Sequence, residues 1–177
     1  MNYSISLLSS INPLFFAVLI VVGVLIAKGV YTYKSYRDLR GKAIREIVLG
    51  GLCLIFVVGV FVVMPLLAGV TVNEDNLALR IPSGLTFETI NEADIVSAKV
   101  VTLDQSDYAI TAKVAGTEIR SYREGIFDLQ NGTEALVFLN GNTALLVETT
   151  NGSLLLGPDR FDDFVKNFGD KLIPVQP

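Results

Sequence analysis

Two long apolar segments occupy most of the first 70 residues. The chain has no charged residue between positions 1 and 27, and none between positions 47 and 73. A helix of roughly 20 apolar residues crosses a bilayer core about 30 Å thick, so each segment is long enough for one crossing. Asn12 and Pro13 suit the cap and the first turn of a helix. We therefore predict a transmembrane helical hairpin over residues 1–68, with spans at about 13–30 and 47–68.

The basic loop, residues 31–46, indicates how this hairpin is oriented. Positive charge is concentrated in and next to it, whereas the N-terminal flank has none and the 20 residues after position 68 have only Arg80. Short loops rich in Lys and Arg stay in the cytoplasm. We therefore predict a two-pass protein of the cell membrane with an extracytoplasmic N-terminus and C-terminal domain. The uncharged N-terminal flank also lacks the positive n-region of a cleaved signal peptide.

The charges of the basic loop allow two interpretations. Any hairpin in this orientation needs them to set its topology, and we favour this interpretation. Alternatively, they bind anionic lipid headgroups, at about 1 kcal/mol per basic residue near the surface. The candidate headgroup contacts are Lys34, Arg37, Arg40, Lys42 and Arg45.

Residues 69–177 contain short apolar segments separated by turn residues, a pattern typical of a β domain. Asn-Gly pairs recur at positions 131–132, 140–141 and 151–152 with short apolar segments between them. Asn-Gly favours a two-residue hairpin turn because both residues tolerate positive φ. Similar short segments lie between residues 70 and 127, which predicts an antiparallel meander. One helix closes the chain, with a single apolar face formed by Phe161, Phe164, Val165, Phe168 and Leu172.

Composition excludes several classes of protein. Hydrophobic residues make up 51% of the chain and charged residues 18%, which excludes intrinsic disorder. The chain has no His and one Cys, so it has no His-based catalysis, no His-containing metal site and no internal disulfide. The net charge of −4 argues against nucleic-acid binding. Residues 69–177 hold eight basic and sixteen acidic residues, so this domain carries the negative charge.

No motif for catalysis, metal binding or cofactor binding stands out. The chain lacks Gly-x-Ser-x-Gly, Ser-x-x-Lys and a phosphate-binding glycine loop, and its acidic residues lack the spacing of the best-known calcium loop. We therefore predict no enzyme activity, cofactor or metal. Asn131 and Asn151 begin Asn-x-Thr and Asn-x-Ser sequences, which makes them candidate glycosylation sites. The plainer explanation is that both asparagines are there for the turns.

About seven antiparallel strands followed by one helix resemble a pleckstrin-homology-like (PH-like) barrel. The second half of the domain is similar to prokaryotic membrane-anchored PH-like domains, and an earlier segment resembles a strand opening of that group. The similar segments are Ala93–Ala98, Tyr122–Phe127, Asn131–Phe138, Asn151–Pro158 and Phe161–Phe168. The resemblance implies a mainly-β barrel capped by a C-terminal helix, and a binding role of unspecified type.

We therefore expect a non-enzymatic accessory or scaffold subunit that binds other proteins of a membrane complex at the outer surface. A PH-like barrel offers an open sheet edge and a groove beside its helix for docking of a peptide. Membrane lipids are the other expected partners. The alternative is a lipid or small-ligand sensor that uses the basic loop and the barrel.

Overall fold

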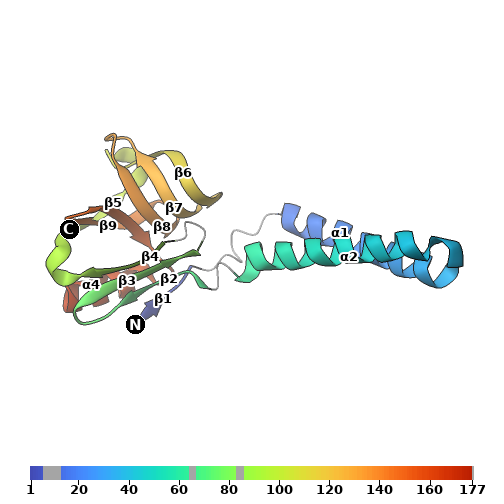
Figure 1. Cartoon of the computed structure of the whole chain (residues 1–177). Helices are drawn as coiled ribbons and strands as arrows, with labels where there is room; N and C mark the ends of the chain where they lie inside the picture. The colour runs from blue at the N-terminus through green and yellow to red at the C-terminus, as the bar shows by residue number, and fades with distance from the viewer. Residues whose placement is uncertain (6–12, 64–66, 83–85, 177) are drawn as a thin grey trace. The chain divides into compact units, whose positions relative to one another are not determined.

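A computed structural model describes residues 1–5, 13–63, 67–82 and 86–176 of the chain, and Figure 1 draws their helices and strands. The chain divides into two compact units. The helical unit comprises residues 11–64, and the β unit comprises residues 1–10 together with residues 65–177. The helical unit is thus an insertion near the N-terminal end of the β unit.

The helical unit consists of two helices packed side by side. Helix α1 (Pro13–Ser35) and helix α2 (Arg40–Val58) are joined by a short 3-10 helix, η2 (Arg37–Leu39), and α2 continues into the π-helical segment η3 (Gly59–Val63). Two glycines allow close packing. A Cβ atom at Gly29 would lie 2.8 Å from Ile47 Cγ1, and one at Gly50 would lie 2.7 Å from Ile26 Cγ1.

The structure supports one of the two predicted membrane spans by helix length and composition. Among the described residues, one helical segment, Phe15–Ser35, has the length and apolar composition to cross a membrane. Helix α2 does not, because Arg40, Lys42, Arg45 and Glu46 lie in its first two turns. The predicted second span, residues 47–68, is divided between α2, η3 and residues 64–66, which lie outside the described residues. The prediction of two transmembrane helices is therefore not supported by helix length and composition.

The β unit contains two sheets. Sheet A has the order β1-β2-β3-β4, with strands Asn2–Tyr3, Gly69–Val72, Asn76–Ile81 and Thr86–Asn91. Sheet B has the order β5-β9-β10-β8-β7-β6. Its strands in chain order are Ile95–Thr102, Ile110–Ile119, Tyr122–Leu129, Glu134–Asn140, Thr143–Thr149 and Gly152–Gly157. Short 3-10 helices, η5 (Glu92–Asp94) and η6 (Leu103–Gln105), flank β5, and helix α4 (Phe161–Lys171) follows β10.

This architecture confirms a mainly-β domain with a C-terminal helix and corrects the predicted barrel. The described part of the chain forms two open sheets of four and six strands instead of one closed barrel of about seven. Not every pair is antiparallel either, because β10 runs parallel to β8. The strand β10 is apolar on both faces, with Leu154, Leu155 and Leu156 buried, as expected for a central strand.

The three Asn-Gly pairs have different outcomes. Asn131-Gly132 joins β7 to β8, and Asn151-Gly152 joins β9 to β10; both strand pairs are antiparallel neighbours, so these hairpins are confirmed. Asn140-Gly141 joins β8 to β9, which are separated in the sheet by β10. This hairpin prediction is wrong. The turn reverses the direction of the chain, but β10 pairs with β8 in the position that β9 would occupy in a hairpin.

The N-terminal residues complete the β unit. Strand β1 pairs with β2 through Asn2↔Thr71 and Tyr3↔Val70, and the N-terminal amine donates a hydrogen bond to the Val72 carbonyl at 2.8 Å. Tyr3 is 1% exposed. Its ring lies 5.2 Å from that of Phe164 in α4, and its hydroxyl donates to the Asp163 carbonyl at 3.2 Å. The predicted apolar face of the C-terminal helix is therefore confirmed, and it packs partly on a strand that the sequence analysis did not predict.

Candidate binding groove

A groove of about 230 Å³ lies where the edge of sheet A meets sheet B. We call it the β4 groove. Strand β4 forms one side, and β7, β8 and the β9–β10 hairpin form the rest. Its lining residues are Glu88, Ile90, Ile126, Glu134, Ala135, Leu136, Thr149, Asn151, Gly152, Ser153 and Leu154.

The β4 groove combines an apolar floor with an acidic rim. Ile90, Ala135 and Leu154 are all at most 5% exposed, so they form its buried surface. Glu88 and Glu134 are exposed and are the charged residues among those that line it. Because the described residues that line the groove include no Lys or Arg, its electrostatics favour a ligand with an apolar stem and a positive charge.

Two hairpin turns hold the rim in place. Asn131 Oδ1 accepts hydrogen bonds from Thr133 N–H at 3.0 Å and from Thr133 Oγ1 at 2.7 Å, just before β8 begins at Glu134. In the β9–β10 turn, Thr149 Oγ1 donates to the Gly152 carbonyl at 2.8 Å and accepts from Asn151 N–H at 3.2 Å. Side-chain bonds of this kind fix turn geometry.

The candidate glycosylation sites thus lie in turns next to the groove. Asn131 and Asn151 are both exposed, and Asn151 lines the groove directly. Their role in the turns is confirmed by the hydrogen bonds of Asn131 and the pairing of β9 with β10. Glycosylation of either residue stays a prediction.

The structure brings the candidate lipid contacts together at one end of the helical unit. Lys34 lies in the last turn of α1, Arg37 in η2, and Arg40, Lys42 and Arg45 in the first two turns of α2; all five are exposed. The Arg40 guanidinium lies 5.2 Å from the centre of the Tyr33 ring. Most of the predicted basic loop is therefore helical, and its charges surround a tight turn.

A polar cluster joins β5 to β9. Glu148 accepts hydrogen bonds from Ser97 Oγ at 2.8 Å and from the Tyr108 hydroxyl at 3.4 Å. Lys99 Nζ donates to the Tyr108 hydroxyl at 3.2 Å and lies 4.8 Å from the centre of its ring. Each of these groups has a hydrogen-bond partner within the cluster. The cluster therefore has a structural role in joining β5 to β9.

A second polar pair is buried in sheet B. Tyr122 and Glu124, both at most 2% exposed, project from the same face of β7, and the Tyr122 hydroxyl donates a hydrogen bond to the Glu124 carboxylate. Burial raises the pKa of Tyr122 well above its ordinary value, and the negative charge and hydrogen bond of Glu124 add to this effect. The phenol is therefore neutral at physiological pH. Neither residue lines the β4 groove.

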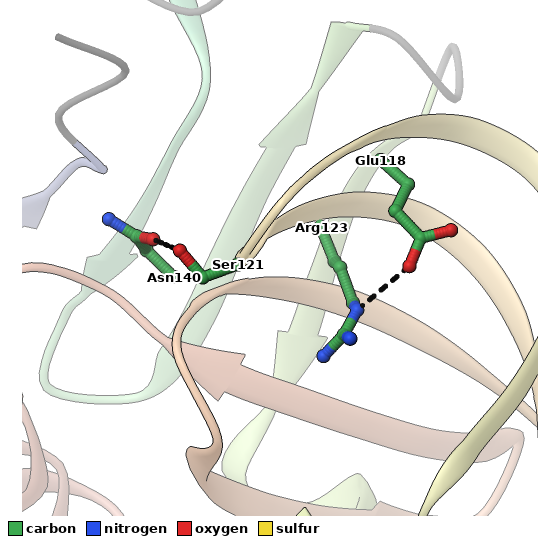
Figure 2. A network of polar contacts seen from close by, with 4 residues as sticks. All are labelled: Glu118, Ser121, Arg123 and Asn140. Carbon is green, nitrogen blue, oxygen red and sulfur yellow. Dashed lines mark hydrogen bonds and ion pairs between the residues drawn. The ribbon is translucent and has the colours of Figure 1, made fainter. Parts of the chain in front are cut away.

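The β6–β7 turn is tied to its surroundings by polar contacts, which Figure 2 shows. Arg120 adopts φ 55° at this turn. Arg123 Nε and Glu118 Oε1 form an ion pair at 3.0 Å, and Ser121 Oγ donates to Asn140 Oδ1 at 2.7 Å. Gly141 N–H also donates to the Ser121 carbonyl at 3.0 Å. The two bonds of Ser121 tie the β6–β7 turn to the connection from β8 to β9.

Sequence reasoning did not find the β4 groove, because its lining combines residues of β4 with residues of β7–β10, which β5 and β6 separate from β4 in the chain. Among the residues that the structure describes, no group of three or more Cys, Asp or Glu side chains is arranged to hold a metal ion.

Comparison with protein families found a match over part of the chain. The family model described as the bacterial PH domain matches residues 68–172. The curated proteins and the solved structures gave no match. The matched region contains β2–β10 and α4, whereas β1 and the helical unit lie outside it.

Proposed function

This chain belongs to the bacterial PH-domain family, and from that premise we propose that it is a non-enzymatic, membrane-anchored accessory or scaffold subunit. The β unit binds another protein at the outer surface of the membrane. Domains of this family have a fold suited to binding, but a fold alone does not specify the ligand. The proposal therefore depends on the helical unit and on the chemistry of the β4 groove.

Exposed apolar side chains on both helices support membrane anchoring. Phe16, Ile20 and Val24 of α1 are 57–66% exposed. Helix α2 exposes Leu49, Leu52, Ile55 and Phe56 to a similar extent, 59–71%. Soluble proteins rarely expose contiguous apolar surface on this scale, so lipid is the natural solvent for both helices. On this proposal α2 and η3 together supply the second crossing.

The single observation that carries the proposed topology is the pairing of β1 with β2. Strand β1 precedes α1, strand β2 follows α2, and they pair through Tyr3↔Val70. A single crossing would put these two strands on opposite sides of the membrane, so their pairing supports the proposal that the helical unit crosses twice. Removal of α1 as a signal peptide would also remove Tyr3 from the core. The positive charge at the α1–α2 turn supports a cytoplasmic position of that turn in this proposal.

The charge of the β unit favours a protein partner over a phosphate-bearing lipid. Residues 69–177 contain sixteen acidic and eight basic residues, and the charged residues of the β4 groove are Glu88 and Glu134. Such a surface repels phosphate and attracts basic groups.

A lipid sensor is the second candidate function. It is favoured by the exposed cluster of Lys34, Arg37, Arg40, Lys42 and Arg45 at the α1–α2 turn, next to the exposed Tyr33. In this case the protein recognises anionic lipids from the cytoplasmic side.

Purification in a mild detergent, followed by mass spectrometry, tests the two functions. A scaffold retains a protein partner in a fixed ratio, and substitution of Arg37 and Arg40 by Gln leaves that ratio unchanged. Purification as a single species without a protein partner contradicts the scaffold function. Co-purified anionic lipid that disappears in the Arg37→Gln/Arg40→Gln variant indicates the sensor instead.

A further inference from the structure

Among the residues that the structure describes, strand β4 has an unpaired backbone edge beside the groove. Glu92 N–H donates to the Asp75 carbonyl at 2.9 Å, which continues the β3–β4 ladder. Hydrogen-bonded pairs alternate along antiparallel strands, so Glu88 and Ile90 direct their backbone groups toward β3. The backbone N–H and C=O groups of Phe87, Thr89 and Asn91 therefore face away from it. Within the described residues, β4 pairs with β3 alone.

The other sheet edges are less suited to accept a strand. The edge of β5 is covered by the C-terminal segment, where Gln176 N–H donates to the Ala98 carbonyl at 2.8 Å. The register of β6 shifts twice against β7, which indicates an irregular edge. Strand β1 has only two residues. In contrast, β4 pairs with β3 over six residues without a shift in register. Exposed regular edges of this kind are templates for an added strand.

We propose that β4 accepts an extended segment of a partner protein and that a Lys or Arg side chain of this segment enters the β4 groove. This inference rests on the proposed protein-binding function and names the chemistry of the partner. Side chains of an added strand alternate between the two faces of the sheet. Those on the face of Glu88 and Ile90 point into the groove, and their neighbours lie beside Phe87, which is 69% exposed.

Charge and shape identify the occupant as basic. The aliphatic stem of a Lys or Arg covers the apolar floor at Ile90 and Leu154, and its charged end reaches the carboxylates of Glu88 and Glu134. An acidic side chain would meet two like charges without a compensating cation in the lining. The partner segment is therefore expected to carry a basic residue next to a large apolar residue that contacts Phe87.

Peptide titration of the full-length protein in neutral detergent tests this proposal. The probe is a fluorescent peptide of alternating Thr and Val with one central Lys, compared with the same peptide carrying Glu in its place. We expect the Lys peptide to bind at least about tenfold more tightly. The Glu88→Lys/Glu134→Lys variant should reverse this preference, whereas Glu74→Lys, an exposed acid in the β2–β3 turn, should not. Equal binding of the two peptides by the wild-type protein overturns the proposal.

A second pair of variants tests the strand edge. Thr89→Pro removes an outward N–H without removing a β3–β4 hydrogen bond, and should abolish binding of the Lys peptide. Thr89→Val keeps the N–H and should retain binding. Thermal unfolding of each variant confirms that it is folded. Unchanged binding to Thr89→Pro overturns the edge-pairing geometry. A concentration-dependent dimer that blocks the peptide overturns the proposed occupant, because a second copy of the chain then takes the edge.

Co-purification separates this proposal from the function on which it rests. A protein partner that is lost from Glu88→Lys/Glu134→Lys and kept by Glu74→Lys supports both. A partner that both variants retain equally contradicts the groove and leaves the scaffold function standing. Absence of any protein partner contradicts the scaffold function itself.

Discussion

At the scale of single residues, the buried hydrogen bond between Tyr122 and Glu124 contributes to the stability of the β unit. Both side chains are buried, and the phenol donates its hydrogen bond to the carboxylate. A buried carboxylate that loses a donor bears a desolvation cost that packing does not offset.

Substitution of Tyr122 by Phe should therefore destabilise the β unit by about 1.5–3 kcal/mol. Chemical denaturation of the full-length protein in detergent measures this difference. Tyr31→Phe, at an aromatic residue that is 65% exposed, is the matched control and should change stability by less than about 0.5 kcal/mol. An equal effect of the two substitutions contradicts the assigned role of the buried pair.

The raised pKa of Tyr122 predicts a loss of stability at alkaline pH. Above about pH 10 the unfolded chain releases the phenolic proton while the folded chain retains it, so the free energy of unfolding falls by at most ~1.4 kcal/mol per pH unit. Denaturation at pH values between 8 and 11 should show this fall in the wild type and a smaller one in Tyr122→Phe. Parallel pH profiles would show that Tyr122 ionises normally.

Tyr3 links the N-terminal strand to the C-terminal helix. Its buried ring packs on Phe164. The guanidinium of Arg160, the residue just before α4, lies 5.6 Å from the centre of the Tyr3 ring. Tyr3→Ala should destabilise the β unit by about 3 kcal/mol or more, because it removes a large buried aromatic group. Tyr36→Ala, at an exposed residue of the helical unit, is the control for thermal unfolding. If Tyr3→Ala unfolds like the control, β1 is not part of the core.

At the scale of elements, some features follow from the sequence and others do not. The spacing of Phe164 and Phe168 predicts the buried face of α4 correctly, since helix periodicity is a local property. Asn131-Gly132 likewise predicts its hairpin. The insertion of β10 between β8 and β9 depends on pairing between distant strands, which no local turn sequence encodes. Strand β1 is too short to show alternation at all.

The packing of α1 against α2 depends on particular glycines. Gly50→Leu would press on Ile26, whereas the neighbouring Gly51 has no atom within 4 Å of a Cβ placed there. We expect Gly50→Leu to destabilise the helical unit by about 1–3 kcal/mol and Gly51→Leu to leave it nearly unchanged. Thermal unfolding monitored by helical circular dichroism in detergent compares the two. Equal effects would contradict the close approach of α1 and α2.

At the scale of the whole molecule, the helical unit is inserted between two paired strands of the β unit. The apolar pattern of the sequence predicted the helices, and the resemblance predicted the PH-like class, which the match to the bacterial PH domain confirms. The β4 groove could not be predicted in the same way, because Glu88 and Glu134 meet only through the packing of the two sheets. Its role as a docking site is the proposal that partner binding must test.

Labelling of single cysteines in sealed cells tests the central claim, that the chain ends of the helical unit share the outer side of the membrane. Cys53 is first replaced by Ala, and cysteine is then introduced at the exposed positions Ser4, Asp38 or Glu74. A membrane-impermeant maleimide should label Ser4→Cys and Glu74→Cys in intact cells, and Asp38→Cys only after permeabilisation. Labelling of Ser4→Cys and Glu74→Cys from opposite sides, or of Asp38→Cys alone in intact cells, would contradict it.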